Sequence, residues 1–343
     1  MTNRDKTIDT LRGLAIFTMV AANMAGPVLI EPHPFLFRFY GSFAAPLFIL
    51  ISGMMVALTA QTKGHNLKYY LVRGMLVIAV GALIDMFIWR IYPFTTVDVL
   101  YLIGISLPLA YLFMRLNTQS QCIIVISIFS LTPFLQNIFG YADYPTEFLF
   151  PSGGLSIIIE NQTNILNHWL VDGWFPVFPW LGFSLLGVIL ANLRLKYKTF
   201  EGSVFFLTGI FLLLFGSVIW HFFPGKLLTR AGYSEVFYPP TPGYIISAVG
   251  LIVLLFFIVD YKHSIIAYNP LQALGESALF MYILHLSLIE YVIVPIWSKE
   301  DFQIFLLLYI ALSLLLILIA YGLRFFKVKW RDHPFIIRFL LGG

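Results

Sequence analysis

The chain is divided into long apolar runs, each close to the length needed to cross a bilayer. A transmembrane helix needs about 20 mostly apolar residues, and polar residues, prolines and glycines separate ten runs of that kind. We predict helices at residues 10–30, 41–60, 71–91, 98–115, 121–139, 176–193, 202–222, 242–260, 275–297 and 303–323. Basic residues precede the first run, as they do in a signal peptide. However, the first run has no convincing cleavage site and nine further runs follow it, so we expect it to be retained.

The composition agrees with a membrane protein. Of 343 residues, 59% are hydrophobic and 11% are charged, whereas about a quarter of the residues in a soluble domain are charged. Soluble enzymes and nucleic-acid-binding proteins are therefore excluded. The single cysteine, Cys122, excludes an internal disulfide and a cysteine-based zinc site. The sequence also lacks an H-E-x-x-H motif, a glycine-rich phosphate loop and a G-x-S-x-G motif, so we expect no metal.

The basic residues are sorted to one side of the predicted membrane. If the N-terminus lies in the cytoplasm, all but five of the 21 lysines and arginines fall on that side, the exceptions being Arg38, Arg90, Lys226, Arg230 and Lys299. We therefore predict an all-α polytopic membrane protein with about ten transmembrane helices, both termini cytoplasmic, and residues 1–343 forming a single domain, because no repeat is evident.

The longest outer loop, about 140–175, contains no lysine or arginine. Near its end it carries a group of aromatic residues: Trp169, Trp174, Phe175, Phe178 and Trp180. Such residues form either a belt at the membrane interface or a rim on which sugars stack. Because long loops in compact proteins are often functional, this loop is a possible acceptor-binding segment.

The first run carries three polar residues that a bilayer disfavours. Asp9 and Arg12 are three residues apart and share a helix face, so they are expected to form an ion pair, or Arg12 binds a phosphate group. Asn23 lies about 16 Å further along the helix axis. Its amide either bonds to a neighbouring helix or orients a carbonyl group and stabilises an oxyanion there.

Other polar residues lie within later runs or beyond the outer ends of runs. His33 is held between two prolines in E-P-H-P, with Glu31 available to orient its ring, and is either an ordinary loop residue or a proton acceptor. His285 lies within an apolar run and is expected to be neutral and bonded to a serine or tyrosine. Asp98, like Asp85 and Glu290, belongs to a buried pair or is a functional carboxylate.

The segment I-D-T-L-R-G-L-A-I-F-T-M-V-A-A-N, residues 8–23, resembles the first span of the transmembrane acyltransferase superfamily. Similar segments follow in the order of the family: A-A-P-L-F-I-L-I-S-G at 44–53, V-D-V-L-Y-L-I-G-I at 97–105, F-P-W-L-G-F-S-L-L-G at 178–187 and L-G-E-S-A-L-F-M-Y-I-L-H at 274–285. Acyltransferase-3 proteins usually carry a histidine at the position of Asn23. The asparagine resembles the heparan-α-glucosaminide N-acetyltransferases and their YeiB-like relatives.

The resemblance implies an acyltransferase-type helical bundle in a bacterial inner membrane, and it is compatible with a homodimer. Its implied activity is transfer of an acyl group from cytoplasmic acetyl-CoA to an amine or hydroxyl of an extracytoplasmic sugar or glycan. Arg12, Asp9 and Arg73 are implied at the CoA, Asn23 at the thioester and His33 as the base or as an acetyl-histidine nucleophile. Asp98, His285 and Glu31 are additional polar candidates near the substrate.

Two other classes of protein remain open at this stage. A secondary transporter of a small polar solute also has about ten spans with ionisable residues, but its two halves should show repeat-like broken helices, and no such pattern is evident. A non-catalytic membrane protein explains the same apolar runs without binding CoA.

Overall fold

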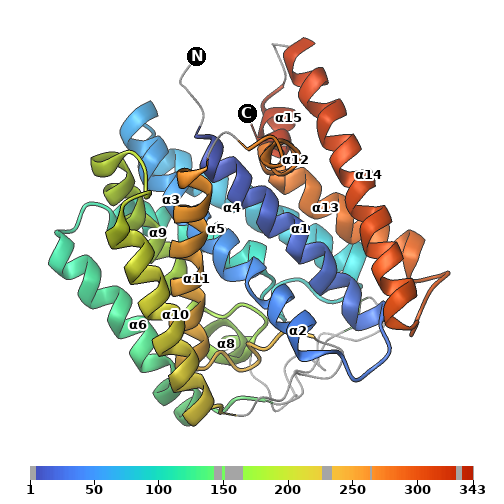
Figure 1. Cartoon of the computed structure of the whole chain (residues 1–343), viewed down its shortest axis with the longest axis horizontal. Helices are drawn as coiled ribbons and strands as arrows, with labels where there is room; N and C mark the ends of the chain where they lie inside the picture. Colours follow the sequence, from blue (N-terminus) through green and yellow to red (C-terminus); the bar gives the residue numbers. More distant parts are fainter. Residues whose placement is uncertain are drawn as a thin grey trace.

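A computed structural model describes residues 5–142, 149–150, 165–225, 234–262, 265–329 and 334–342. Within these ranges the regular structure is helical, apart from isolated bridges (Figure 1). The helices are α1 (Lys6–Val28), α2 (Phe35–Ser42), α3 (Ala44–Lys63), α4 (Leu67–Ile84), α5 (Val99–Phe113), α6 (Thr118–Phe139), α8 (Ile165–Asn167), α9 (Val177–Tyr197), α10 (Ser203–Phe222), α11 (Pro242–Tyr261), α12 (Tyr268–Glu276), α13 (Ala278–Leu288), α14 (Phe302–Lys329) and α15 (Phe335–Leu341), with π-helical turns η1 (Asp85–Trp89), η2 (His168–Asp172) and η3 (Ile289–Ile293).

The prediction of an all-helical membrane protein is confirmed, since every predicted run coincides with one helix or with a pair of adjacent helices. By length and composition, eight described helical segments are long and apolar enough to span a membrane, or nine if the bent pair α12–α13 is one span. The remaining predicted run is α5, whose 15 residues extend about 22 Å. That length is shorter than the hydrocarbon core, which is about 30 Å thick.

The run predicted at 275–297 contains the last two residues of α12, a break at Ser277, α13 and the turn η3. Helices α12 and α13 are bent by 92° relative to each other, and Ser277 between them has non-helical dihedral angles. The Lys327 ammonium on α14 donates to the Glu276 carbonyl at 3.0 Å and to the Ser277 hydroxyl at 2.8 Å. These bonds satisfy polar groups that the break removes from a regular helix.

Helix α1 lies against many other elements, contacting α2, α3, α11, α12, α13 and α14. It begins earlier than predicted because the Asp5 carboxylate caps its first turn, accepting bonds from the backbone N–H groups of Thr7 and Ile8. It ends at Val28, after which Leu29 pairs with Glu300 in an isolated bridge. Asp9, Arg12 and Asn23 are therefore all carried by one continuous helix.

Two glycines allow α1 and α12 to approach closely. A Cβ atom on Gly13 would lie 1.8 Å from the Leu271 carbonyl oxygen, and one on Gly275 would lie 1.9 Å from the Asp9 carbonyl oxygen. Small residues of this kind permit close contact between membrane helices. The contact fixes α12 against the part of α1 that carries Asp9 and Arg12.

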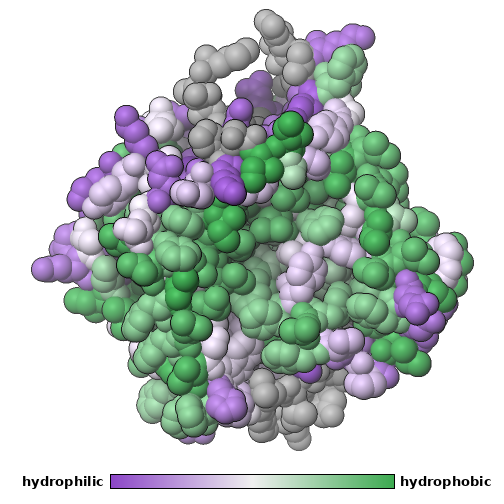
Figure 2. Space-filling model, in the orientation of Figure 1, coloured by the Kyte–Doolittle hydropathy of each residue, from purple (hydrophilic) through white to green (hydrophobic). Residues whose placement is uncertain are grey.

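The peripheral helices expose apolar side chains. The exposed large apolar residues include Ile123, Ile126 and Phe134 on α6, Leu207, Phe211 and Leu214 on α10, and Leu307, Leu314 and Leu318 on α14. Figure 2 shows hydrophobic residues across the middle of one face, with hydrophilic residues gathered along its upper edge. This distribution, together with the apolar helices, is that of a multi-pass integral membrane protein.

The glycine contact predicts a specific loss of stability. Gly13→Ala should lower the free energy of unfolding by about 2 kcal/mol, because the new methyl group meets a backbone carbonyl that cannot move alone. Gly322→Ala on α14 is the matched control, since no atom lies within 4 Å of its added Cβ. Thermal unfolding of the detergent-solubilised variants measures the difference, and equal midpoints for Gly13→Ala and Gly322→Ala would contradict this view of the α1–α12 contact.

Candidate functional site

A cavity of about 1000 Å³ lies at the end of the bundle where α1 begins. Its lining comes from several helices, among them α1, α3, α4, α5, α9 and α13, together with the C-terminal residues Phe339 and Gly342. The cavity is therefore built by segments from both ends of the sequence.

The lining has two chemically different parts. One part carries basic side chains, namely Arg12, Lys63, His65, Arg73, Arg194 and Lys198, and two acidic ones, Asp5 and Asp9. The other part is apolar and includes Ile51, Val77, Leu100, Ile103 and Leu279. This lining suits a ligand that is anionic in one part and weakly polar in another.

Asp9 and Arg12 form the ion pair predicted from their spacing, with 3.7 Å between Asp9 Oδ1 and Arg12 Nη1. The Asp9 side chain is 6% exposed and that of Arg12 is 20% exposed. Asp9 thus holds one side of the Arg12 guanidinium, whose planar group has five donors.

Arg73 lies in the same basic part of the cavity. Its Nη1 donates to the Tyr69 hydroxyl at 3.2 Å, and its guanidinium lies 5.5 Å from the centre of the Phe339 ring. The ring of Tyr69 is also stacked on His65, with 3.8 Å between ring centres. Aromatic contacts therefore hold the Arg73 side chain at the cavity while leaving donors on its guanidinium.

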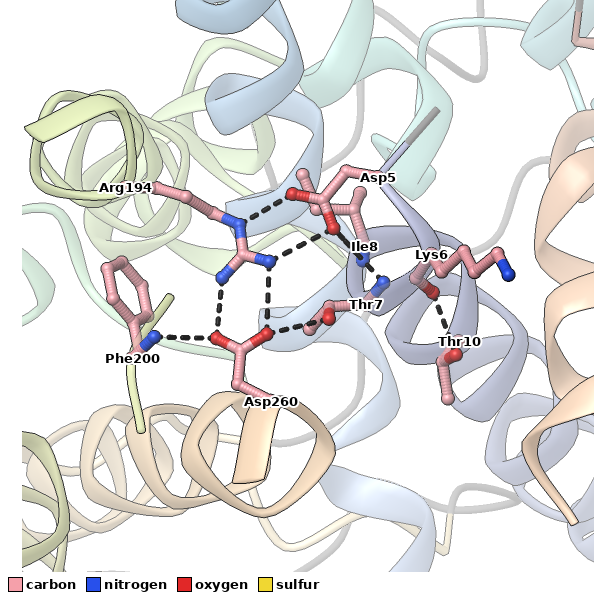
Figure 3. Close-up of polar contacts among 8 residues, drawn as sticks. All are labelled: Asp5, Lys6, Thr7, Ile8, Thr10, Arg194, Phe200 and Asp260. Atoms are coloured by element: carbon pink, nitrogen blue, oxygen red, sulfur yellow. Dashed lines mark hydrogen bonds and ion pairs between the residues drawn. The ribbon is translucent and has the colours of Figure 1, made fainter. Parts of the chain in front are cut away.

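A charge cluster, in which Arg194 and Asp260 are buried and Asp5 is partly exposed, joins α1, α9 and α11 beside the cavity (Figure 3). Arg194 Nε donates to Asp5 Oδ2 at 2.6 Å, and its Nη1 donates to Asp260 Oδ2 at 2.6 Å. Asp260 also accepts from the Thr7 hydroxyl and from the backbone N–H of Phe200, both at 2.7 Å. Arg194 lines the cavity but is neutralised by two carboxylates.

Farther along α1, Asn23 contacts His285 of α13. The Asn23 amide nitrogen lies 3.0 Å from His285 Nε2, and His285 Nδ1 lies 2.9 Å from the Met281 carbonyl oxygen. His285 is fully buried, whereas Asn23 is partly accessible. The prediction that His285 bonds to a serine or tyrosine is wrong, because its partners are an asparagine and a backbone carbonyl.

Two buried carboxylates lie near the start of α5. Asp98 caps this helix by accepting from the Leu100 N–H at 2.9 Å, and it also accepts from the Tyr282 hydroxyl at 3.1 Å. Asp85 accepts from the Tyr101 hydroxyl at 2.5 Å. Asp98 therefore connects α5 with α13. Its partner on α13, Tyr282, lies about one helical turn before His285.

His33 lies beyond the opposite end of α1. Its Nε2 lies 3.1 Å from the Leu29 carbonyl oxygen and its Nδ1 lies 3.0 Å from the Ser234 hydroxyl. Because a carbonyl only accepts, Nε2 donates this hydrogen bond, and in the neutral ring Nδ1 then accepts from the Ser234 hydroxyl. Glu31 is exposed and does not make the orienting contact that we expected, since both described ring contacts go to other groups.

The next residue after Ser234 carries an unusual carboxyl group. Burial raises the pKa of Glu235 to about 7, although backbone hydrogen bonds and the charge of Arg38 act in the opposite direction. Arg38 Nε also donates to the Ser234 carbonyl oxygen at 3.2 Å. A titratable carboxyl and a guanidinium thus flank the serine that contacts His33.

The aromatic residues near the end of the long outer loop differ in exposure. Trp180 is 1% exposed and Trp174 is 7% exposed, so both are part of the packed interior and not of a sugar-stacking rim. Trp169 is partly accessible, and its Nε1 donates to the Phe94 carbonyl oxygen at 3.0 Å. Most of the proposed acceptor-binding segment, residues 143–148 and 151–164, lies outside the described residues.

The structure thus brings Asp9, Arg12 and Arg73 to one cavity and places Asn23 against His285. Asn23 and His33 are not among the residues that line the described cavity. Within the ranges that the structure describes, no group of three or more histidine, cysteine or acidic side chains is placed to hold a metal ion.

Comparison of the sequence with known protein families gives one match. Residues 4–216 match the family described as heparan-alpha-glucosaminide N-acetyltransferase, catalytic. The chain belongs to this family. The matched residues are more than half of the chain and contain the segment at 8–23, so the acetyltransferase resemblance is confirmed. No curated protein matches the chain. The segment at 274–285, which carries His285, lies beyond the residues that the catalytic family matches.

The charge cluster predicts that a conservative substitution of Asp260 causes a large loss of stability. Asp260→Asn should lower the free energy of unfolding by about 3 kcal/mol, because it removes half of the negative charge that compensates the buried Arg194. Glu276→Ala is the control: it breaks the Arg324–Glu276 pair, whose side chains are 33% and 21% exposed, and should cost about 1 kcal/mol or less. Thermal unfolding in detergent compares the two, and an equal cost would contradict the anchoring role of the cluster.

Proposed function

We propose that this protein transfers an acyl group from cytoplasmic acyl-CoA to an amine or hydroxyl of a sugar or glycan on the other side of the membrane. The observation that carries the proposal is the cavity beside Arg12, which is basic in one part and apolar in the other. Membership of an acetyltransferase family supports the same reaction class.

The residues of the cavity fit the chemistry of an acyl-CoA. The anionic nucleotide end suits Arg12 and Arg73, supported by Lys63 and Lys198 at the same cavity. The long pantetheine arm suits the apolar part at Leu100 and Leu279. At about 1000 Å³, the cavity is at the upper end of the range for small-molecule sites, roughly 300–1,000 Å³.

The sidedness of the proposal follows from the basic residues. The cavity is lined by Arg12, Lys63, Arg73, Arg194 and Lys198, all of which belong to the side with the excess of positive charge. By the positive-inside rule this end faces the cytoplasm. His33 and Ser234, which lie past the other end of α1, then face outward.

The acyl group must travel beyond the described cavity to reach Asn23. Leu279 lines the cavity, and His285, which contacts Asn23, lies six residues later on α13, or about 9 Å along the helix axis. A flexible pantetheine arm is suited to cross this distance between helices, so we expect the thioester to lie at the Asn23 amide.

The CoA thioester supplies the activated acyl group, and the residues of the chain supply positioning and proton transfer. An N–H of the Asn23 amide stabilises the negative charge that develops on the acyl oxygen. His33 Nδ1 accepts the proton of the attacking amine or hydroxyl after the acceptor replaces Ser234 as its partner. The new bond joins the acceptor to the acyl carbon, the carbon–sulfur bond breaks, and the electron pair leaves with sulfur.

The proposal predicts stabilisation by the donor. Acetyl-CoA, but not acetate, should raise the unfolding temperature of the detergent-solubilised protein, because only acetyl-CoA occupies the basic part of the cavity. Arg12→Ala and Arg73→Ala should each weaken this binding by about tenfold or more, the effect of losing a charge-assisted hydrogen bond. Arg115→Ala is the matched control, since Arg115 is a basic residue that contacts Tyr111 and does not line the cavity.

A second variant separates donor binding from catalysis. His33→Ala should retain the stabilisation by acetyl-CoA and lose transfer to D-glucosamine by roughly 10²-fold or more. No stabilisation of the wild-type protein by acetyl-CoA would overturn the proposed function, and full transfer by His33→Ala would remove His33 from it.

A further inference from the structure

The contact between Asn23 and His285 joins two helices that are far apart in sequence. The Asn23 amide nitrogen is 3.0 Å from His285 Nε2. His285 has an exposed fraction of 0%, while residue Asn23 is partly accessible. The pair therefore has one buried member and one member that reaches accessible space.

The surroundings of His285 determine which of its nitrogens carries the hydrogen. Nδ1 lies 2.9 Å from the Met281 carbonyl oxygen, which can only accept a hydrogen bond, so Nδ1 is the donor. In the neutral ring, Nε2 is then an acceptor. The group that faces it must be the NH₂ of Asn23, because the amide oxygen would meet the lone pair on Nε2.

This contact fixes the orientation of the Asn23 amide. One amide N–H is directed at His285, so the second N–H and the carbonyl oxygen point elsewhere. Without the His285 acceptor, a rotation of the amide by half a turn would exchange nitrogen and oxygen at little cost. His285 thus decides which amide atoms Asn23 presents on its accessible side.

The ring of His285 is itself held in place. Tyr282 packs against it with 5.4 Å between ring centres and an angle of 74° between the ring planes. The Tyr282 hydroxyl donates to Asp98, which caps α5. The orientation of Asn23 therefore depends on a connected set of contacts that involves α1, α5 and α13.

We propose that His285 is a positioning residue that orients the Asn23 amide so that its second N–H donates to the carbonyl oxygen of the acyl group. This inference rests on the proposed function, since it takes an acyl thioester as the ligand at Asn23. His285 does not itself exchange a proton with the substrate, because it is fully buried and both of its ring nitrogens are hydrogen-bonded.

The carbonyl stretching band of bound acetyl-CoA reports this hydrogen bond directly. With acetyl-CoA labelled with ¹³C at the acetyl carbonyl, isotope-edited infrared difference spectra of the solubilised protein should show the band shifted to lower wavenumber on binding. Asn23→Ala should abolish the shift. His285→Leu, which leaves the Asn23 NH₂ without its acceptor, should abolish it as well.

Two conservative variants keep the test valid if His285→Leu fails to fold. His285→Gln places an amide oxygen near the position of Nε2 and should retain part of the shift. His285→Asn places its amide near the position of Nδ1, leaves Asn23 without its partner and should lose the shift. Ser287→Ala is the matched control on α13, since it removes a hydrogen bond to Ile283 and should leave the band shifted as in the wild type.

Rates of CoA release in the presence of D-glucosamine provide a second readout. If His285 acts through Asn23, the double variant Asn23→Ala/His285→Leu should be no slower than Asn23→Ala alone, whereas an independent structural role gives additive losses.

The outcomes separate this inference from the proposed function. If acetyl-CoA does not bind the wild type, the proposed function fails. If it binds but its band does not shift, or if His285→Gln and His285→Asn give the same band, the positioning role of His285 is overturned while donor binding stands.

Discussion

The ion cluster of Asp5, Arg194 and Asp260 determines where α1 begins and how it is anchored to its neighbours. Asp5 has two functions in it, since its carboxylate both caps α1 and binds Arg194 of α9. Because the start of the helix is fixed, the direction of every later side chain on α1 is fixed too. Arg12 and Asn23 are 11 residues apart, which is about 20° more than three full helical turns. They therefore lie on the same face of α1, one beside the cavity and the other against His285.

The cluster also explains why Arg194 differs from the other basic residues at the cavity. A buried guanidinium without compensation is strongly destabilising, and here two carboxylates compensate it. Arg194 is thus a structural cation, whereas Arg12 and Arg73 remain the residues with which we expect the anionic end of a donor to interact. The glycine contact between α1 and α12 completes this arrangement, because it holds the break at Ser277 against the same end of α1.

Much of the fold follows from the sequence because it depends on local information. Apolar runs of about 20 residues indicate membrane helices, and the spacing of Asp9 and Arg12 indicates an ion pair; both were confirmed. The break at Ser277 was missed because it lies only two residues inside the predicted run, and the side chain that bonds to it belongs to Lys327, fifty residues away in the sequence. The partner of His285 was missed for the same reason, since Asn23 is 262 residues away.

Asp5 and Asp260 carried a usable signal, because each lies at the predicted cytoplasmic end of a run, on the same side as Arg194. Ser234 carried none, since its contact with His33 is set by how two outer segments meet.

The central claim is that acyl transfer connects the two sides of the membrane through this bundle. It is tested by reconstituting the protein in proteoliposomes that enclose D-glucosamine, adding acetyl-CoA with a radiolabelled acetyl group outside, and measuring labelled N-acetylglucosamine inside. The account predicts that enclosed labelled product accumulates with the wild type and not with His33→Ala. Labelled product that forms only when donor and acceptor are on the same side would contradict it.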